Sequence, residues 1–403
     1  MTGGRSRWEK RRIVLAFSLF NFVFAFANWM VVVYLPIYLR NELVFSPQRI
    51  GVLIGAYMIT TLLLILPLGY LSDRVSPKRL VQVGAGLFVV YAAMLVLART
   101  FWGLLAAQVV GGTGDAIIMI VLPALLYKDL DAVGRGRSVG VFIAGGMFGF
   151  ALGPLVSGAL LEWAGLPYRA VFGVVGGMAA LLMGVSMWLK DAAPLRIHLA
   201  DYLGDIRRRE VLLVVIAIAG IGFHFGQERT NYPLFLRNVA GLSAWNVGLV
   251  FALLGSWMGG MTLLIGRLFD RNTHLLVLIG AGLVLSGGMH IATPHVGTFG
   301  AILAVRALHT IGDVAVIFCY SVLVASIFPQ ERLGGNSGFT FLFRAMGAVV
   351  GAAVAGQLDK AFPSLKVSFA AAGGVMIVCG AVLLLNWRTL RRVSRGMRVV
   401  EGN

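Results

Sequence analysis

The sequence predicts an all-α integral membrane protein whose twelve transmembrane helices form two pseudo-symmetric six-helix bundles. Three observations predict this fold class. Of the 403 residues, 59% are hydrophobic and only 13% are charged, whereas a soluble domain carries about 25% charged residues. Apolar runs long enough to cross a bilayer follow one another through most of the chain. In addition, the second half of the sequence repeats the first at a nearly constant offset.

The repeat is visible as an ungapped match between residues 34–74 and residues 231–271, each partner lying 197 positions further on. After one inserted residue the match continues at an offset of 198. Matching pairs include Pro36 and Pro233, Gly69 and Gly266, Asp73 and Asp270, Asp115 and Asp313, and Gly149 and Gly347. Such self-similarity indicates two copies of one helical unit.

Twelve uncharged or nearly uncharged runs of about 20 residues or more are candidate spanning helices. They comprise residues 13–39, 50–72, 80–98, 102–127, 138–161, 168–189, 211–236, 245–266, 275–294, 298–328, 336–358 and 365–387. The first run is too long for a signal peptide and lacks a small-residue cleavage site, so it counts as the first helix. Because the longest polar connection follows the sixth helix, we expect an N-terminal bundle at 1–189, a cytoplasmic linker at 190–210 and a C-terminal bundle with a basic tail at 211–403.

The net charge of +17 is distributed unevenly when both termini are placed in the cytoplasm. Most of the 34 Lys and Arg residues then fall on the cytoplasmic side, as the positive-inside rule requires. The excess positive charge therefore indicates topology and contact with membrane lipid headgroups, and it argues against nucleic-acid binding. We expect a multi-pass protein of the cytoplasmic (inner) membrane with both termini in the cytoplasm.

Signals of enzyme chemistry are missing from the sequence. We find no phosphate-binding loop, no dinucleotide-binding GxGxxG at a strand–helix turn and no nucleophile elbow. The two cysteines, Cys319 and Cys379, lie inside apolar runs and indicate neither a disulfide framework nor a metal cluster. We therefore expect no enzymatic activity, no cofactor and no metal site, and we do not expect this chain to use ATP.

Two loops share a pattern that runs from a glycine to an arginine. Residues 69–79 read GYLSDRVSPKR and follow the second predicted helix, and residues 266–271 read GRLFDR and follow the eighth. Both resemble the loop signature G-x-L-x-D-R-x-G-R-K of the major facilitator superfamily, although the second lacks the trailing basic pair. An aspartate at this place can bind exposed N–H groups at the start of a neighbouring helix. The resemblance implies a cytoplasmic gate that latches the two halves, formed by Gly69, Asp73, Arg74, Gly266, Asp270 and Arg271.

The fifth predicted helix carries a ridge of small residues. Residues 149–158 read GFALGPLVSG, which is similar to a fifth-helix motif of the same superfamily, g-x-x-x-G-P-x-x-G-G. The candidate packing residues are Gly149, Gly153, Pro154 and Gly158, where small side chains permit close helix contact. Within the superfamily this motif is most often seen in proton-coupled exporters. The resemblance covers the whole chain and implies transport by alternating access around a site near the membrane midplane.

Polar side chains inside the predicted helices are the best candidates for a substrate cavity, because an unpartnered charge in hydrocarbon is costly. Helical spacing places most of them in stripes on the first, fourth, seventh and tenth helices. In the superfamily that the chain resembles, the same four helices line the central cavity. The candidates are Asn21, Asn28, Gln108, Gln227, Asn231, Arg306, His309, Tyr320 and, on the eleventh helix, Arg344.

Four titratable residues are candidates for proton coupling, namely Asp115, Asp313, Glu228 and His224. Asp115 and Asp313 occupy equivalent places in the two halves. A carboxylate removed from water in a membrane cavity can load a proton on one side and release it on the other. Each aspartate could instead be structural and bond to a facing helix or to Arg344, and His224 could be tied up in hydrogen bonds rather than act as a relay. Arg344 could also bind an anionic group of the substrate.

Together these features predict a secondary active transporter for a small organic solute, with proton-coupled efflux as the leading expectation. The first alternative is proton symport that takes up an organic anion or a metal chelate, because the predicted cavity mixes acids and bases. The second alternative is a non-transporting membrane sensor or assembly protein, which the paired gate loops argue against. The sequence indicates no particular substrate and no oligomer, and a monomer suffices for alternating access.

Overall fold

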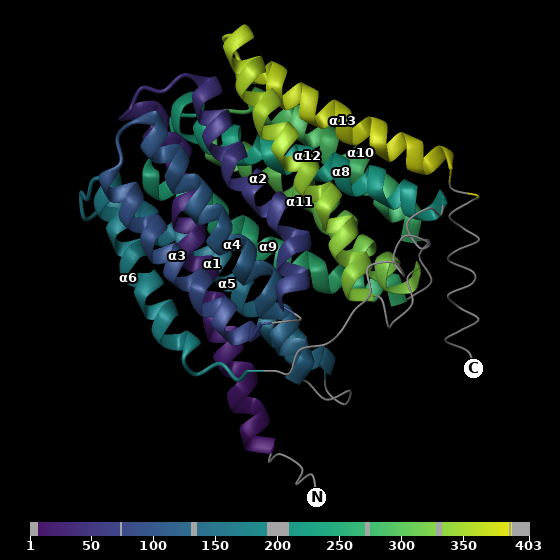
Figure 1. Ribbon diagram of the computed structural model, residues 1–403. Helices are drawn as coiled ribbons and strands as arrows, with labels where there is room; N and C mark the ends of the chain where they lie inside the picture. The colour runs from purple at the N-terminus through teal and green to yellow at the C-terminus, as the bar shows by residue number, and fades with distance from the viewer. Residues whose placement is uncertain are drawn as a thin grey trace, which may run out of the picture. The chain divides into compact units, whose positions relative to one another are not determined.

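The predicted all-helical membrane fold is confirmed in the computed structural model (Figure 1). The structure describes residues 7–72, 75–129, 135–191, 209–270, 275–327, 333–386 and 388. Among these residues there is no strand, and twelve helices are long and apolar enough to cross a membrane. The helices of the first half are α1 (Arg7–Asn41), α2 (Pro47–Ser72), α3 (Pro77–Leu97), α4 (Phe101–Asp129), α5 (Arg135–Glu162) and α6 (Tyr168–Ser186).

The second half of the chain forms six further long helices and two short helical turns. They are α8 (Arg209–Leu234), the π-helical turn η2 (Phe235–Val239), α9 (Ala244–Asp270), α10 (Leu275–Ala292), the 3-10 turn η3 (Thr293–His295), α11 (Phe299–Ile327), α12 (Leu333–Ala361) and α13 (Leu365–Leu385). Helices dominate because a spanning segment has to satisfy its backbone hydrogen bonds internally when no water is available.

Polar residues at the ends of the apolar runs set where several helices begin. The hydroxyl of Ser76 accepts a hydrogen bond from the backbone N–H of Arg79 at 3.2 Å, at the start of α3. In the same way, Ser364 accepts from the N–H of Lys366 at 3.3 Å, at the start of α13. These side chains satisfy N–H groups that the first turn of a helix cannot pair by itself.

Packing divides the chain into two compact units. The first unit contains α1, α3 to α6, the part of α2 from Ile59 onward and the start of α9 (Ser243–Gly255). The second unit contains α8, α10 to α13, the start of α2 (Val44–Met58) and the part of α9 from Ser256 onward. Two helices, α2 and α9, therefore contribute residues to both units. The predicted boundary at 190–210 stays a prediction, since residues 192–208 lie outside the described residues.

Within the first unit, α5 lies directly on α1 because glycines replace side chains along the contact. A Cβ atom on Gly149 would lie 2.6 Å from the backbone oxygen of Phe22, which is closer than real Cβ contacts come. Next to this ridge, the carbonyl oxygen of Pro154 accepts a hydrogen bond from the hydroxyl of Tyr34 at 3.2 Å. The fifth-helix glycines that the sequence singled out thus lie in a tight helix–helix contact.

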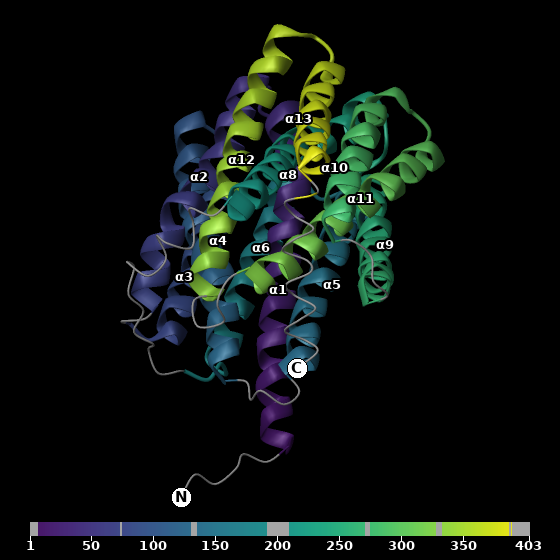
Figure 2. The same cartoon turned by 90° about the vertical axis from the view of Figure 1, so that its right-hand side faces the viewer.

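The second unit contains the same kind of contact between α8 and α12, which run alongside each other in Figures 1 and 2. Gly347 and Gly351 stand 198 positions after Gly149 and Gly153. A Cβ atom on Gly351 would collide with the backbone carbonyl of Phe223 on α8. Equivalent glycines therefore make equivalent helix contacts in the two units, and they bring backbones as close as van der Waals packing allows.

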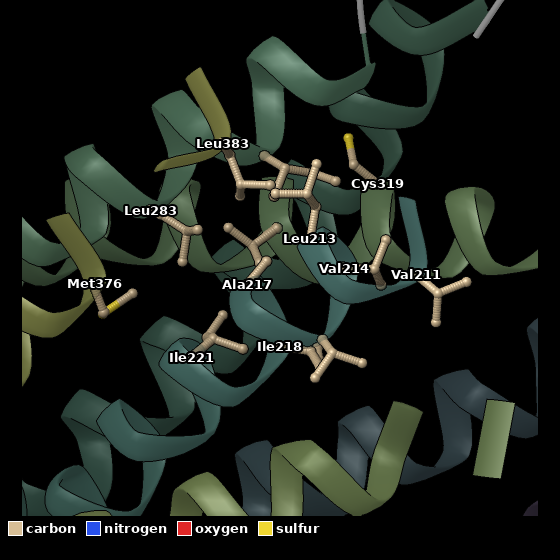
Figure 3. Packing of buried hydrophobic residues seen from close by; sticks show 13 residues of the cluster. Val211, Leu213, Val214, Ala217, Ile218, Ile221, Leu283, Cys319, Met376 and Leu383 are labelled. Carbon is tan, nitrogen blue, oxygen red and sulfur yellow. The ribbon is translucent and has the colours of Figure 1, made fainter. Parts of the chain in front are cut away.

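An apolar cluster joins α8, α10, α11 and α13 within the second unit. In Figure 3, Ala217 and Ile221 of α8 lie on the side of Leu283 of α10 and Met376 of α13, and Val214 lies next to Val211 of its own helix. Lipid tails are as apolar as these side chains, so close packing rather than transfer out of water holds the helices together. The cluster matters for the site because the same four helices carry the buried polar residues described below.

The α8–α12 contact leads to a stability prediction. Gly351→Ala should destabilise the protein by about 1–3 kcal/mol, because the added methyl group has no space beside the Phe223 carbonyl. Gly374→Ala in α13 is the matched control, since a Cβ atom there meets nothing within 4 Å. The measurement is the thermal unfolding midpoint of the purified protein in detergent. Equal midpoints for both variants would contradict the close crossing of α8 and α12.

Candidate functional site

A cluster of polar side chains lies inside the second unit, and we call it the buried polar network. Its members come from α8, α10, α11 and α13 and comprise His224, Gln227, Glu228, Asn231, Ser286, His290, Arg306, His309, Asp313 and Ser368. Helical periodicity explains the contributions of α8 and α11, because residues three, four and seven positions apart share one face of a helix. The predicted stripes of the seventh and tenth helices therefore meet each other in the fold.

An ion pair between Arg306 and Glu228 joins α11 to α8. The guanidinium Nη2 donates to Oε1 of Glu228, and the guanidinium carbon lies 4.1 Å from the ring centroid of Tyr232. Arg306 is only 3% exposed, so its charge needs these partners. Its Nε and Nη1 atoms have no hydrogen-bond partner among the described residues.

Two imidazoles and two carboxylates converge beside this ion pair. The Nε2 atom of His224 lies 2.8 Å from Oε2 of Glu228, and Nε2 of His309 lies 3.1 Å from Oδ2 of Asp313. The two Nε2 atoms are 3.2 Å apart. Both histidines are fully buried, and the side chains of Asp313 and Glu228 are 3% and 16% exposed, so these four side chains form one continuous and largely buried group of contacts.

Ser286 of α10 orients two members of the network. Its backbone carbonyl accepts a hydrogen bond from Nδ1 of His309 at 2.9 Å, and its hydroxyl donates to Oδ1 of Asp313 at 2.5 Å. A carbonyl oxygen can only accept, so the Nδ1 atom of His309 carries a proton. In the neutral imidazole, Nε2 then bears a lone pair that faces Asp313.

A second group of contacts extends the network toward α13. The Nε2 atom of His290 donates to the side-chain oxygen of Gln227 at 2.7 Å, and the side-chain amide of Asn231 donates to the hydroxyl of Ser368 at 2.8 Å. His290 and Ser286 are not among the residues that were predicted from the sequence. Their spacing of four residues on the ninth predicted helix was the available signal, because it places both on one helix face.

In the first unit, the polar stripes of α1 and α4 also meet. The side-chain amide of Asn28 donates to Oδ1 of Asp115 at 3.4 Å, and both residues are buried. The side-chain oxygen of Gln108 accepts a hydrogen bond from the hydroxyl of Tyr91 on α3 at 2.9 Å. Asn21 has a different partner, since its amide donates to the backbone oxygen of Phe142 on α5 at 2.9 Å. The structure thus brings Asn28 and Asp115 together, whereas Asn21 bonds to the fifth helix.

Of the two remaining cavity candidates, Tyr320 contacts α12 and Arg344 is part of it. The hydroxyl of Tyr320 hydrogen bonds to the hydroxyl of Thr340, and the guanidinium of Arg344 lies 4.3 Å from the ring centroid of Phe341 on its own helix. Their predicted roles toward substrate or toward an aspartate stay predictions.

Most of the predicted gate falls at helix ends or outside the described residues. Gly69 and Gly266 lie near the ends of α2 and α9, and Asp270 is the last residue of α9. Asp73, Arg74 and Arg271 lie outside the described residues, so the latch stays a prediction. An unpredicted contact lies next to the first loop, where the backbone N–H of Lys78 donates to Oδ1 of Asp191 at 3.2 Å. This bond joins the start of α3 to the residue that follows the sixth span.

Comparison with known sequences identifies relatives that cover most of the chain. Multidrug resistance protein 1 of Bacillus subtilis (strain 168) is 24% identical over 389 residues, which are 94% of this chain and 97% of the relative. The fosmidomycin resistance protein of Escherichia coli (strain K12) is 26% identical in a match that covers 79% of this chain and 80% of the relative. A probable sugar efflux transporter of Helicobacter pylori (strain G27) is 26% identical in a match that covers 68% of this chain and 69% of the relative.

Two solved structures share the fold. A bacterial homologue of the human lysosomal transporter Spinster, in an inward-facing and unoccupied conformation, has a TM-score of 0.77 at 16% identity and covers 97% of this chain and 98% of its own. The nucleoside transporter NupG has a TM-score of 0.76 at 12% identity and covers 93% of this chain and 99% of its own. The sequence profile of the Major Facilitator Superfamily matches residues 17–298. With this match and twelve spanning helices, the chain belongs to the major facilitator superfamily and is a multi-pass membrane transporter, not an enzyme.

Proposed function

We propose that this transporter exports a small organic solute across the cytoplasmic membrane and that protons moving inward drive the export. The names of three relatives support the direction, because they describe drug resistance, fosmidomycin resistance and sugar efflux. The driving force follows from the missing nucleotide-binding motifs, which leave an ion gradient as the energy source. Both termini are proposed to lie in the cytoplasm, and the linker at 190–210 tethers the two halves.

The observation that carries the proton coupling is the buried contact between Asp115 of α4 and Asn28 of α1. Asparagine is uncharged, so it can remain bonded to the aspartate in either protonation state by turning its amide. Glu228 and Asp313 lie in the second unit, where Arg306 and two imidazoles hold them in ion pairs and hydrogen bonds. Because Asn28 can follow either protonation state of its partner, we assign proton loading first to Asp115, and coupling roles for Glu228, Asp313 and His224 stay predictions.

In the proposed cycle, Asp115 takes up a proton while the cavity is open to the outside. Loss of its charge removes the cost of keeping a carboxylate in a closed, dry cavity. Opening toward the cytoplasm hydrates the side chain again, and the proton leaves. The solute binds in the cytoplasm-facing state and leaves in the outward-facing state, as alternating access requires.

The contacts of Arg306 favour export over the alternative of organic-anion uptake. A cavity that recruits an anion needs a cation to neutralise it, whereas the charge of Arg306 is already paired with Glu228 and stacked on Tyr232 within one unit, which leaves Arg344 as the anion-binding candidate of the uptake alternative. The sensor or assembly alternative is less favoured, because the named relatives are transporters or resistance proteins over most of this chain's length.

The first functional prediction concerns Asp115. Asp115→Asn should abolish uphill export while leaving solute exchange down its gradient intact, because an amide cannot carry the proton. Export would be measured in cells with three probes, namely ethidium, fosmidomycin and a labelled non-metabolised sugar, each with and without a protonophore. Glu42→Gln is the matched control, since it makes the same chemical change at an exposed carboxylate of the described chain.

The outcomes separate the proposals. Proton-coupled export is supported if wild-type cells become depleted of a probe and if this depletion disappears both with the protonophore and in Asp115→Asn. Full uphill export by Asp115→Asn would show that the proton is carried elsewhere. Accumulation of a probe by the wild type would reverse the direction and favour symport.

The second functional prediction concerns the ion pair. Arg306→Met leaves the carboxylate of Glu228, whose side chain is 16% exposed, without its guanidinium. Loss of one partner of a fully buried pair costs about 3–5 kcal/mol, which is the upper bound here. Arg306→Met combined with Glu228→Gln should recover much of that loss, because the uncompensated charge is gone. Unfolding midpoints of the two single variants and the double variant would be compared in detergent. A double variant no more stable than Arg306→Met would mean that the two residues are not coupled, which would leave Arg306 available for substrate.

A further inference from the structure

We propose that His224, Glu228, His309 and Asp313 form a binding site for a divalent first-row transition-metal ion, with Zn²⁺ as the best-matched metal. The proposal goes beyond the export function and does not depend on the direction or the coupling of transport. It depends on the geometry of four ligand atoms and on the groups that hold the ligand side chains in place.

The separations between the four ligand atoms match a tetrahedral metal site. Five of the six distances among the Nε2 atoms of His224 and His309, Oε2 of Glu228 and Oδ2 of Asp313 are 2.8, 3.1, 3.2, 3.8 and 3.9 Å. Zinc ligands lie about 2.0–2.2 Å from the metal, so neighbouring ligands of a tetrahedral site are about 3.3–3.6 Å apart. The distances in the cluster fall on both sides of this range, so an ion at the centre requires only small side-chain shifts.

The ligands come in two equivalent pairs. α8 supplies His224 and Glu228 at i and i+4, and α11 supplies His309 and Asp313 at the same spacing. This spacing projects two ligands from one face of a helix, as in helical zinc sites that carry two histidines four positions apart. A metal ion would thus connect two helices within the second unit, with two ligands from each.

The groups behind the ligands orient them toward one point. The carbonyl of Ser286 holds Nδ1 of His309, the hydroxyl of Ser286 holds Oδ1 of Asp313, and Arg306 holds Oε1 of Glu228. In each case the second polar atom of the ligand is engaged, and the remaining nitrogen or oxygen faces the cluster. Metal sites in proteins use this kind of outer-shell support to fix tautomer and orientation.

A third histidine lies beside the four ligands. Nδ1 of His290 is buried and has no hydrogen-bond partner among the described residues, and it bears a lone pair because Nε2 of His290 donates to Gln227. One ring nitrogen from each of His224, His290 and His309 lies within 4.8 Å of the other two. A buried acceptor without a partner is costly, so His290 is the candidate for an additional ligand. Nδ1 of His224 is also unpaired among the described residues, but it is not one of the four ligand atoms.

Electrostatics also calls for a cation at the centre. The lone pair of Nε2 on neutral His309 faces a carboxylate oxygen of Asp313 at 3.1 Å, and two acceptors at this distance repel unless a proton or a metal ion lies between them. Two imidazoles with two carboxylates suit zinc and its neighbours in the first row, whereas Ca²⁺ and Mg²⁺ prefer six or more oxygen ligands. A proton is the competing occupant, and the experiment has to separate the two.

The test uses the full-length protein, purified in detergent with an affinity tag that contains no histidine. After treatment with a chelator, Zn²⁺ binding is followed by calorimetry and Co²⁺ binding by visible absorption. We expect one equivalent of metal, an intense visible cobalt spectrum typical of tetrahedral N/O coordination, and a higher unfolding midpoint because the ion binds the folded state. Metal content of the protein isolated from zinc-supplemented cells gives an independent readout.

Variants then locate the metal. His309→Gln and, on the other helix, His224→Gln should each weaken Zn²⁺ binding by about 10- to 100-fold or more, because loss of even an outer-shell partner has an effect of that size. His295→Gln is the matched control, since His295 is exposed in η3 and outside the cluster. Midpoints of the metal-free variants identify any that fail to fold, and the second histidine variant then carries the test.

Two results would overturn the proposal. In the first, the wild-type protein contains no metal when it is purified and binds neither Zn²⁺ nor Co²⁺, even after incubation at a temperature just below its unfolding midpoint. Protons would then be the only occupants of the cluster. The second is wild-type affinity retained in both cluster variants, which would place the metal elsewhere on the protein.

Discussion

A charge inside the hydrocarbon layer has to be neutralised by a partner within the protein, and this constraint organises the second unit. Arg306 is almost fully buried, and its partner Glu228 comes from a different helix. Because Glu228 also contacts His224, and His224 contacts His309, one rotational setting of α8 against α11 makes all of these contacts together. The glycine contact between α8 and α12 involves the same helix, α8, whose orientation the polar contacts restrict. A rotation of α8 would therefore disturb the packing against α12 and the polar contacts with α11 at the same time.

The two halves of the internal repeat share their glycine helix contacts but differ in the polar side chains around their matching aspartates. Gly149 and Gly347 stand at matching positions and bring matching pairs of helices together. Asp115 and Asp313 also stand at matching positions, yet an asparagine contacts the first, whereas a serine and two histidines contact the second. Helix contacts constrain side-chain volume, and most changes there are costly. Polar partners can be replaced one at a time as long as each buried group stays satisfied, so two halves of one origin can take up different tasks.

The sequence carried enough information to predict the twelve spans and the polar stripes, because both depend on periodicity within one helix. It could not predict that His290 and Ser286 complete the network, since a contact between helices depends on how each helix is rotated. The four-residue spacing on α10 was visible, but many buried helices carry an isolated serine or histidine without function. Asp191 was hidden for a different reason, because its partner Lys78 lies more than 100 residues earlier in the chain. The absence of a metal-ligand motif in the sequence has the same origin, as the converging ligands come from two helices.

The side chains of α8 are mostly apolar in its first half and mostly polar in its second half, and the apolar half holds the buried polar network in place. From Val211 to Ile221 the helix packs into the apolar cluster, and from His224 onward it presents polar side chains to α10, α11 and α13. The apolar end positions the helix through many weak contacts, so the polar end does not need loops to orient its side chains. Groups fixed by packed helices keep their geometry more precisely than groups on loops. The four atoms proposed to bind a metal ion are therefore held near one point by α8 and α11 themselves.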